Sequence, residues 1–245
     1  MRDAVLAETV RFEGHGGDLV EAYAARPLAA ASTGGVVVIH HMPGYDEPTK
    51  EITRRFAARG YNALCPNLYY REAPGASPDD AAAAARAAGG VPDERLIGDV
   101  GAAARWLRAL PSSNAKVATI GYCSGGRQSF LSACHLPLDA AVVCYGAFIV
   151  GDPPQGLAVS PILDDAHGIT CPVLGLFGAD DQFPSPEQVA QIETRLAELG
   201  KKHEFHVYEG AGHAFFAVNR PSYRPEAAND GWERIWAFFG EYLAG

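Results

Sequence analysis

Short apolar runs alternate with longer amphipathic stretches along most of this chain. The apolar runs predict strands at 36–40, 61–65, 116–121, 140–146, 172–178 and 202–208. Apolar residues at helical spacing predict helices at 47–60, 93–110, 185–200 and 225–243, and a further helix after 121. Strands that alternate with helices of this length favour βαβ units and a mostly parallel sheet.

Two regions add to this pattern. Residues 4–26 alternate around the turn EGHGG and predict two more strands. The Ala-rich segment 81–90 follows a Pro/Gly-rich loop at 67–78 and predicts a short helix on a mobile cap. Functional side chains are expected on the loops at the carboxyl ends of the parallel strands.

Composition narrows the class of protein. The chain has 245 residues, 48% of them hydrophobic, and neither a linker nor a repeat is evident, so a single domain over 1–245 is expected. Its formal net charge of −9 argues against nucleic acid and anionic membranes as partners. No apolar run reaches the roughly 20 residues of a membrane span, and no secretory signal is expected. The five cysteines form no CxxC or zinc-type spacing, which favours a reducing cytoplasm.

The segment GYCSGG, residues 121–126, offers both a thiol and a hydroxyl as nucleophile. A nucleophile elbow needs small residues two places before and two places after the nucleophile, because its turn is tight. Centred on Cys123, these positions hold Gly121 and Gly125. Centred on Ser124, the first position would hold a bulky tyrosine. We therefore expect Cys123 to be the nucleophile, rather than a small packing residue or part of a phosphate loop, for which the glycine spacing is wrong.

The elbow also predicts how the thiol would be activated. The turn would hold Cys123 in a strained, exposed position, and the N-terminus of the following helix would favour its thiolate form. The backbone N–H of Ser124 would then face the oxygen of a tetrahedral intermediate.

A thiol that attacks a carbonyl needs a base and a group that orients the base. The segment 172–184 contains G-x-x-D-x-x-P spacing, which favours Asp181 over its neighbour Asp180 as the acid. EGAGHAFF follows a later strand and offers His213 as the base. The sequence contexts of the histidines at 15, 135, 167, 203 and 206 give less support for the role of base.

The segment HHMPG follows the first core strand, where a second oxyanion donor commonly arises. We expect the backbone N–H of Met42 to be that donor. His40 and His41 lack further metal ligands nearby in the sequence, so neither a metal nor a cofactor is expected.

At these motifs the chain resembles the dienelactone hydrolase family of α/β-hydrolases. The resemblance covers nearly the whole length and rests on GYCSGG at 121–126, GADDQF at 178–183 and AGHAFF at 211–216. It implies a mostly parallel central sheet flanked by helices on both faces. It also implies hydrolysis of an enol-lactone ring through an acyl-thioester, with a cysteine, histidine and aspartate triad at the positions identified above.

The chain also departs from that family. Lactonases of the family carry a glutamate beside the resting thiol, where this chain has His41. They bind the substrate carboxylate with two arginines, and one of these positions holds Ala217 here. Arg71, Arg86 and Arg220 are the candidate replacements.

If fewer arginines bind a substrate carboxylate, the substrate pocket should be less polar than in those lactonases. Tyr70, Tyr145, Phe215 and Phe216 are candidates for its lining, although aromatic side chains in such loops pack in the core just as often. His41, Tyr70, Arg71, Tyr145 and Phe215 are thus the expected substrate-binding residues.

The leading hypothesis is a cytoplasmic cysteine hydrolase of small-molecule esters or lactones, monomeric or homodimeric. An acyltransferase that uses the same thioester is the first alternative, because an amine or alcohol could replace water as acceptor. A binding protein that retains only the scaffold is the second. The presence of nucleophile, base and acid at motif positions argues against it.

Overall fold

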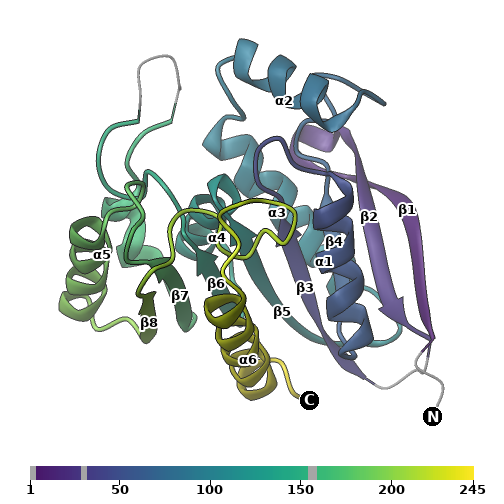
Figure 1. Cartoon of the computed structure of the whole chain (residues 1–245). Coiled ribbons are helices and arrows are strands. Elements are labelled where there is room, and N and C mark those ends of the chain that lie inside the picture. The colour runs from purple at the N-terminus through teal and green to yellow at the C-terminus, as the bar shows by residue number, and fades with distance from the viewer. Residues whose placement is uncertain (1–3, 29–31, 154–158) are drawn as a thin grey trace.

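The computed structural model describes residues 4–28, 32–153 and 159–245, and an eight-stranded sheet lies at its centre (Figure 1). The strands are β1 (Val5–Glu13), β2 (Leu19–Pro27), β3 (Thr33–Ile39), β4 (Asn62–Pro66), β5 (Ser113–Tyr122), β6 (Ala140–Cys144), β7 (Val173–Gly178) and β8 (His203–Tyr208). Their order across the sheet is β1-β2-β4-β3-β5-β6-β7-β8.

The strand directions match the expected βαβ organisation. β1 and β2 form an antiparallel pair, and β2 meets β4 antiparallel. All pairings from β4 through β3 to β8 are parallel. The loops that follow β3, β5, β7 and β8 therefore emerge at one edge of the sheet, which brings residues far apart in the sequence together.

Helices cover both faces of the sheet. α1 (Glu47–Ala58) and α6 (Pro225–Tyr242) pack on one face through Phe56, Trp232 and Phe239. They lie in front of the sheet in Figure 1. α3 (Asp93–Arg108), α4 (Ser124–His135) and α5 (Pro186–Glu198) pack on the other face, with α2 (Pro78–Ala87) joined to the same apolar cluster. This confirms the α/β-hydrolase architecture.

The local sequence explains where several helices begin. Asp46 caps α1 by accepting the Thr49 N–H, and Ser185 and Gln188 form a reciprocal capping box at the start of α5. The Ala-rich segment forms α2, as predicted, and Ser77 caps it. Two short 3-10 helices, His15–Gly17 and Leu163–Gly168, were not predicted, because such short segments have no helical periodicity. Within the described ranges, no helix combines the length and apolarity needed to cross a bilayer.

Candidate active site

Cys123 lies at a sharp turn between β5 and α4. Its φ of 58° and ψ of −120° are outside the regions that side-chain-bearing residues usually adopt. A β-carbon on Gly121 would overlap the Gly125 carbonyl, and one on Gly125 would overlap the Ile39 carbonyl. The two glycines of the motif are therefore required by close backbone contact, which is the geometry that the spacing predicts.

The Cys123 side chain differs from the other thiols in its exposure. Cys123 is half-buried and lines two pockets, whereas Cys65, Cys134, Cys144 and Cys171 are buried. Burial raises the pKa of each of these four thiols and so disfavours their reactive thiolate forms.

Asp181 and His213 meet beside this sulfur. The Nδ1 atom of His213 lies 2.8 Å from Oδ2 of Asp181. The Asp181 side chain is 2% exposed and also accepts the backbone N–H of Phe183 at 2.9 Å. Asp180 is exposed and makes no side-chain contact of this kind within the described structure. The structure therefore brings together Asp181, His213 and Cys123, with Asp180 outside the group.

The environment of His213 favours its protonated form. Burial of the ring opposes protonation, but hydrogen bonds to Asp181 and to the Cys123 side chain, together with their charges, outweigh it. The balance raises the pKa of His213 to about 10. The Tyr145 ring packs edge-on against the imidazole, with ring centroids 5.1 Å apart, and limits where the imidazole can move.

The loop after β3 supplies the opposite wall. His41 and Met42 line a pocket with Cys123. The Nε2 atom of His41 lies 3.1 Å from Oδ2 of Asp46. Burial of Asp46 disfavours its charged form, but hydrogen bonds from His41 and Thr49 outweigh this and lower the pKa of Asp46 below its ordinary value. The ring of His41 is thus held by a carboxylate, a partner that the sequence did not reveal.

The two expected oxyanion donors are placed at the loop ends. Ser124 is the first residue of α4, so the helix does not use its N–H. Among the hydrogen bonds between described residues, none has the backbone N–H of Ser124 or Met42 as donor. This is consistent with the expected role of both amides as oxyanion donors.

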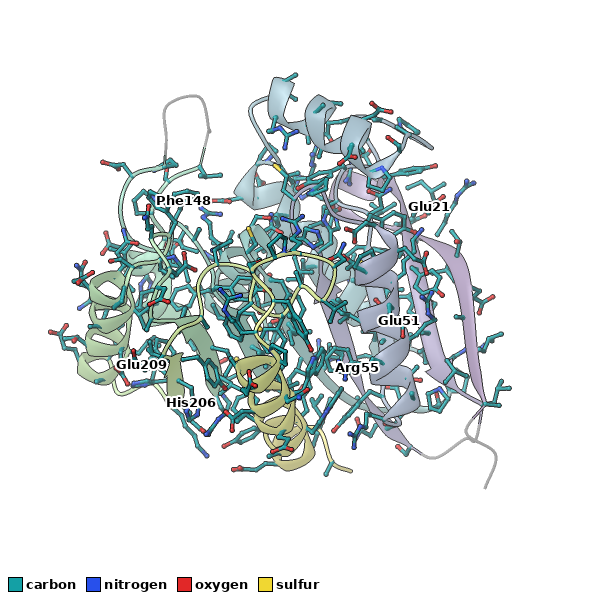
Figure 2. The ribbon with its side chains drawn as sticks, in the orientation of Figure 1. Glu21, Glu51, Arg55, Phe148, His206 and Glu209 are labelled. Atoms are coloured by element: carbon teal, nitrogen blue, oxygen red, sulfur yellow. The ribbon has the colours of Figure 1, made fainter. Side chains whose placement is uncertain are left out.

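One pocket, of about 550 Å³, extends from Cys123 toward α1 and α6. Tyr145 and Phe216 line it, and so do Arg54, Arg55, Val218, Arg220 and Trp232. The Arg55 guanidinium lies 4.4 Å from the Trp232 ring centroid, and Figure 2 shows Arg55 between α1 and α6. No sequence pattern indicated the α1 and α6 residues, because a pocket residue on an amphipathic helix cannot be told apart from any other surface residue by its spacing.

Three expected substrate-binding residues do not line this pocket. Phe215 is completely buried and packs in the core against Tyr208, while its neighbour Phe216 faces the pocket. Tyr70 lines neither pocket of the site. The prediction for Phe215 was wrong, because the turn of the chain beyond β8 decides which side chain faces inward.

The prediction for Arg71 was also wrong. Its guanidinium bonds both carboxylate oxygens of the fully buried Asp99, at 2.7 and 2.9 Å, and Asp18 at 2.8 Å. These contacts hold the Arg71 side chain away from Cys123, and it lines neither pocket of the site. Arg86 lies exposed on α2 and lines neither pocket, so Arg220 is the candidate that reaches the site.

A second pocket, of about 470 Å³, lies on the other side of Cys123 and His213. Its wall comes from the loops after β6 and β7: Ala147, Phe148, Asp180, Asp181, Gln182 and Phe183. Figure 2 shows Phe148 on the side of the molecule where α5 lies, away from Arg55. Neither Phe148 nor Phe183 was expected at the site from its sequence context. Among the described residues, no group of three His, Cys, Asp or Glu side chains is arranged to hold a metal ion.

Comparisons with known proteins agree with this geometry. Residues 20–243 match the model of the dienelactone hydrolase family. A "putative carboxymethylenebutenolidase" of Salmonella typhimurium is 37% identical over 232 residues, covering 92% of this chain and 84% of that protein. A crystal structure titled "putative dienelactone hydrolase", from Klebsiella pneumoniae, superposes with a TM-score of 0.87 at 33% identity, over 98% of this chain and all of that one. A "probable 2-oxo-3-(5-oxofuran-2-ylidene)propanoate lactonase" of Bradyrhizobium is 28% identical over 95% of this chain and 93% of that protein.

Proposed function

Because this chain belongs to the dienelactone hydrolase family and is a hydrolase of ester or lactone bonds, we propose that it cleaves them through an acyl-thioester on Cys123. The observation that carries the proposal is the position of His213, whose Nδ1 atom lies 2.8 Å from Asp181 and whose side chain lines both pockets together with Cys123. The three groups would act as nucleophile, base and orienting acid. The chemistry needs no cofactor.

In the first step, the Cys123 sulfur attacks the carbonyl carbon of the substrate as a thiolate. The protonated ring of His213 and the N-terminus of α4 both stabilise that thiolate. The charge that develops on the carbonyl oxygen is bound by the N–H groups of Met42 and Ser124. The C–O bond then breaks, and His213 donates its proton to the departing oxygen.

In the second step, water attacks the thioester. The sulfur no longer carries charge at this stage, so one cause of the raised pKa of His213 is removed. The ring can then accept a proton from the attacking water. Asp181 keeps Nδ1 protonated and leaves Nε2 free for this transfer, since the 2.8 Å contact is at Nδ1.

The test compares the native protein with Cys123→Ala on p-nitrophenyl acetate and on a dienelactone. We expect product release by the native protein and rates near background for Cys123→Ala. Cys171→Ala is the matched control, since it removes a buried thiol outside the site, and it should keep native activity. Mass spectrometry of the digested protein should show the acyl group on the peptide that contains Cys123.

Equal rates for the native protein and Cys123→Ala would overturn the thioester mechanism. Turnover of the lactone without turnover of the ester would restrict the substrate to lactones. An added amine or alcohol that raises turnover and appears acylated in the product would instead support an acyltransferase.

A further inference from the structure

The two pockets of the site meet at Cys123 and His213, the two groups that line both. A hydrolase that passes through an acyl intermediate must place an acyl part and an alcohol part on different sides of its nucleophile. The two pockets could therefore hold one part each, and the residues that line them indicate which pocket holds the acyl part and which the alcohol part.

Met42 lines the first pocket and is absent from the lining of the second. Its N–H is an expected donor to the carbonyl oxygen, so the acyl part lies toward the first pocket. The departing oxygen must lie near His213, which supplies its proton. The second pocket is bounded by His213 and by the loop that carries Asp181, which places the alcohol part there.

The second pocket is aromatic. The rings of Phe148 and Phe183 pack at its wall, tilted by 45° to each other and with centroids 5.9 Å apart. Phe183 is 48% exposed, so a large apolar surface remains open to water beside the reacting groups. Phe148 has a φ of 61°, a conformation that costs free energy for a bulky residue and is found most often at functional sites.

The position of this wall is tied to the reacting groups. Asp181 accepts the Phe183 backbone N–H at 2.9 Å through one oxygen, and its other oxygen contacts His213 at 2.8 Å. One buried carboxylate thus fixes both the base and the aromatic wall. A group bound against Phe183 would be held at a set position relative to the ring that donates the proton.

The charge around the second pocket restricts what can bind there. Asp180 lines it, and none of the described residues of its wall is Lys or Arg. The first pocket is lined by Glu47 and Glu51, which both pair with Arg54, and also by two further arginines, Arg55 and Arg220. An anionic alcohol part is therefore disfavoured in the second pocket, and an uncharged one is favoured.

We propose that the second pocket is a binding site for an uncharged aromatic alcohol part, so that the substrates include aryl or arylmethyl esters. This inference rests on the proposed function. In the step concerned, the S–C bond to Cys123 forms and the C–O bond to the aryl-bearing oxygen breaks. That oxygen takes the proton of His213, and the neutral alcohol leaves through the second pocket.

The first test uses benzyl acetate and 2-methoxyethyl acetate, whose alcohols are of similar acidity. The variant is Phe183→Ala, and Val218→Ala is its control, because Val218 lines only the first pocket and is 70% exposed. We expect Phe183→Ala to lower kcat/KM for benzyl acetate about fivefold, with little change for 2-methoxyethyl acetate. Val218→Ala should leave the ratio of the two esters at its native value.

The second test changes charge without removing an aromatic group. Gln182→Lys should raise kcat/KM for 4-carboxybenzyl acetate relative to benzyl acetate by at least about threefold. Equal losses for both esters in Phe183→Ala, or no charge effect in Gln182→Lys, would overturn this inference while leaving the proposed function intact. If Phe183→Ala changed kcat/KM only among esters that differ in their acyl chain, the acyl part would lie in the second pocket. That result would also overturn this inference. Cleavage of the dienelactone without cleavage of any ester would overturn this inference alone, whereas cleavage of neither would overturn the proposed function itself.

Discussion

The Nε2 atom of His40 accepts the backbone N–H of Leu68 at 3.2 Å. Its Nδ1 atom lies 2.8 Å from the carbonyl oxygen of the adjacent His41, to which it donates. The ring is 1% exposed and packs edge-on against Tyr69, at 4.8 Å between centroids. One neutral imidazole therefore joins the loop after β3 to the loop after β4, two residues before Met42.

This contact predicts that His40 positions the oxyanion-binding loop. His40→Phe should fill the space but lose both hydrogen bonds, so kcat for p-nitrophenyl acetate should fall about tenfold or more while KM changes little. His40→Gln, which can form part of the same contacts, should recover part of kcat. Steady-state kinetics on variants checked for folding by circular dichroism would measure this. A folded His40→Phe with native kcat would contradict it.

His40 also predicts a pH dependence of stability. Burial lowers the pKa of His40 from 6.5 to about 4, and the charge of His41 adds to this, whereas the hydrogen bond to the His41 carbonyl and the charge of Asp46 oppose it. As pH falls below 6.5, the unfolded chain takes up the proton first, so stability is lost as pH falls from 6.5 to about 4. The loss should amount to about 3 kcal/mol. Urea unfolding at several pH values should show it, and His40→Gln should show a smaller slope in this window.

The raised pKa of His213 predicts a change when the sulfur is removed. Two of its causes are the hydrogen bond to Cys123 and the charge of Cys123. In Cys123→Ala both are lost while the contact with Asp181 remains, so the pKa of His213 should fall from about 10 toward its ordinary range. NMR titration of the histidine ring protons in both proteins would test this. An unchanged pKa would show that the thiol and the imidazole are not coupled.

The neighbouring aspartates offer a matched pair. Asp181→Asn removes the carboxylate that orients His213, and kcat should fall about a hundredfold or more. Asp180→Asn alters an exposed residue one position away and should leave kcat within about twofold for an uncharged ester. Similar losses in the two variants would indicate that the loop as a whole, rather than one carboxylate, supports activity.

The space around two glycines, one in the elbow and one in α6, predicts opposite effects of substitution by alanine on stability. A β-carbon on Gly125 would overlap the Ile39 carbonyl, so Gly125→Ala should destabilise the protein by about 2 kcal/mol or more and abolish ester hydrolysis. Gly240 lies in α6 with open space around it, and Gly240→Ala should stabilise the protein by about 0.5–1 kcal/mol. Thermal melts and ester kinetics would separate the two. Native activity in Gly125→Ala would contradict the requirement for a close approach.

The sequence by itself determined the features that depend on local rules. Strand and helix periodicity predicted the βαβ order, and steric limits at the elbow selected Cys123 over Ser124 without reference to any distant residue. The structure places Asp181 and His213 on loops at strand carboxyl ends because parallel strands all end at one edge of the sheet.

Tertiary structure alone decided which side chains surround these groups. Arg71, in the loop after β4, pairs with Asp99, which lies 28 positions away on α3, and no local pattern indicates such a partner. Phe215 and Phe216 are adjacent in the sequence, but the turn after β8 buries one and leaves the other at the pocket. The second pocket exists only where the loops after β6 and β7 meet. Pocket walls of this kind arise from long-range packing, whereas periodicity and steric limits act between near neighbours in the chain.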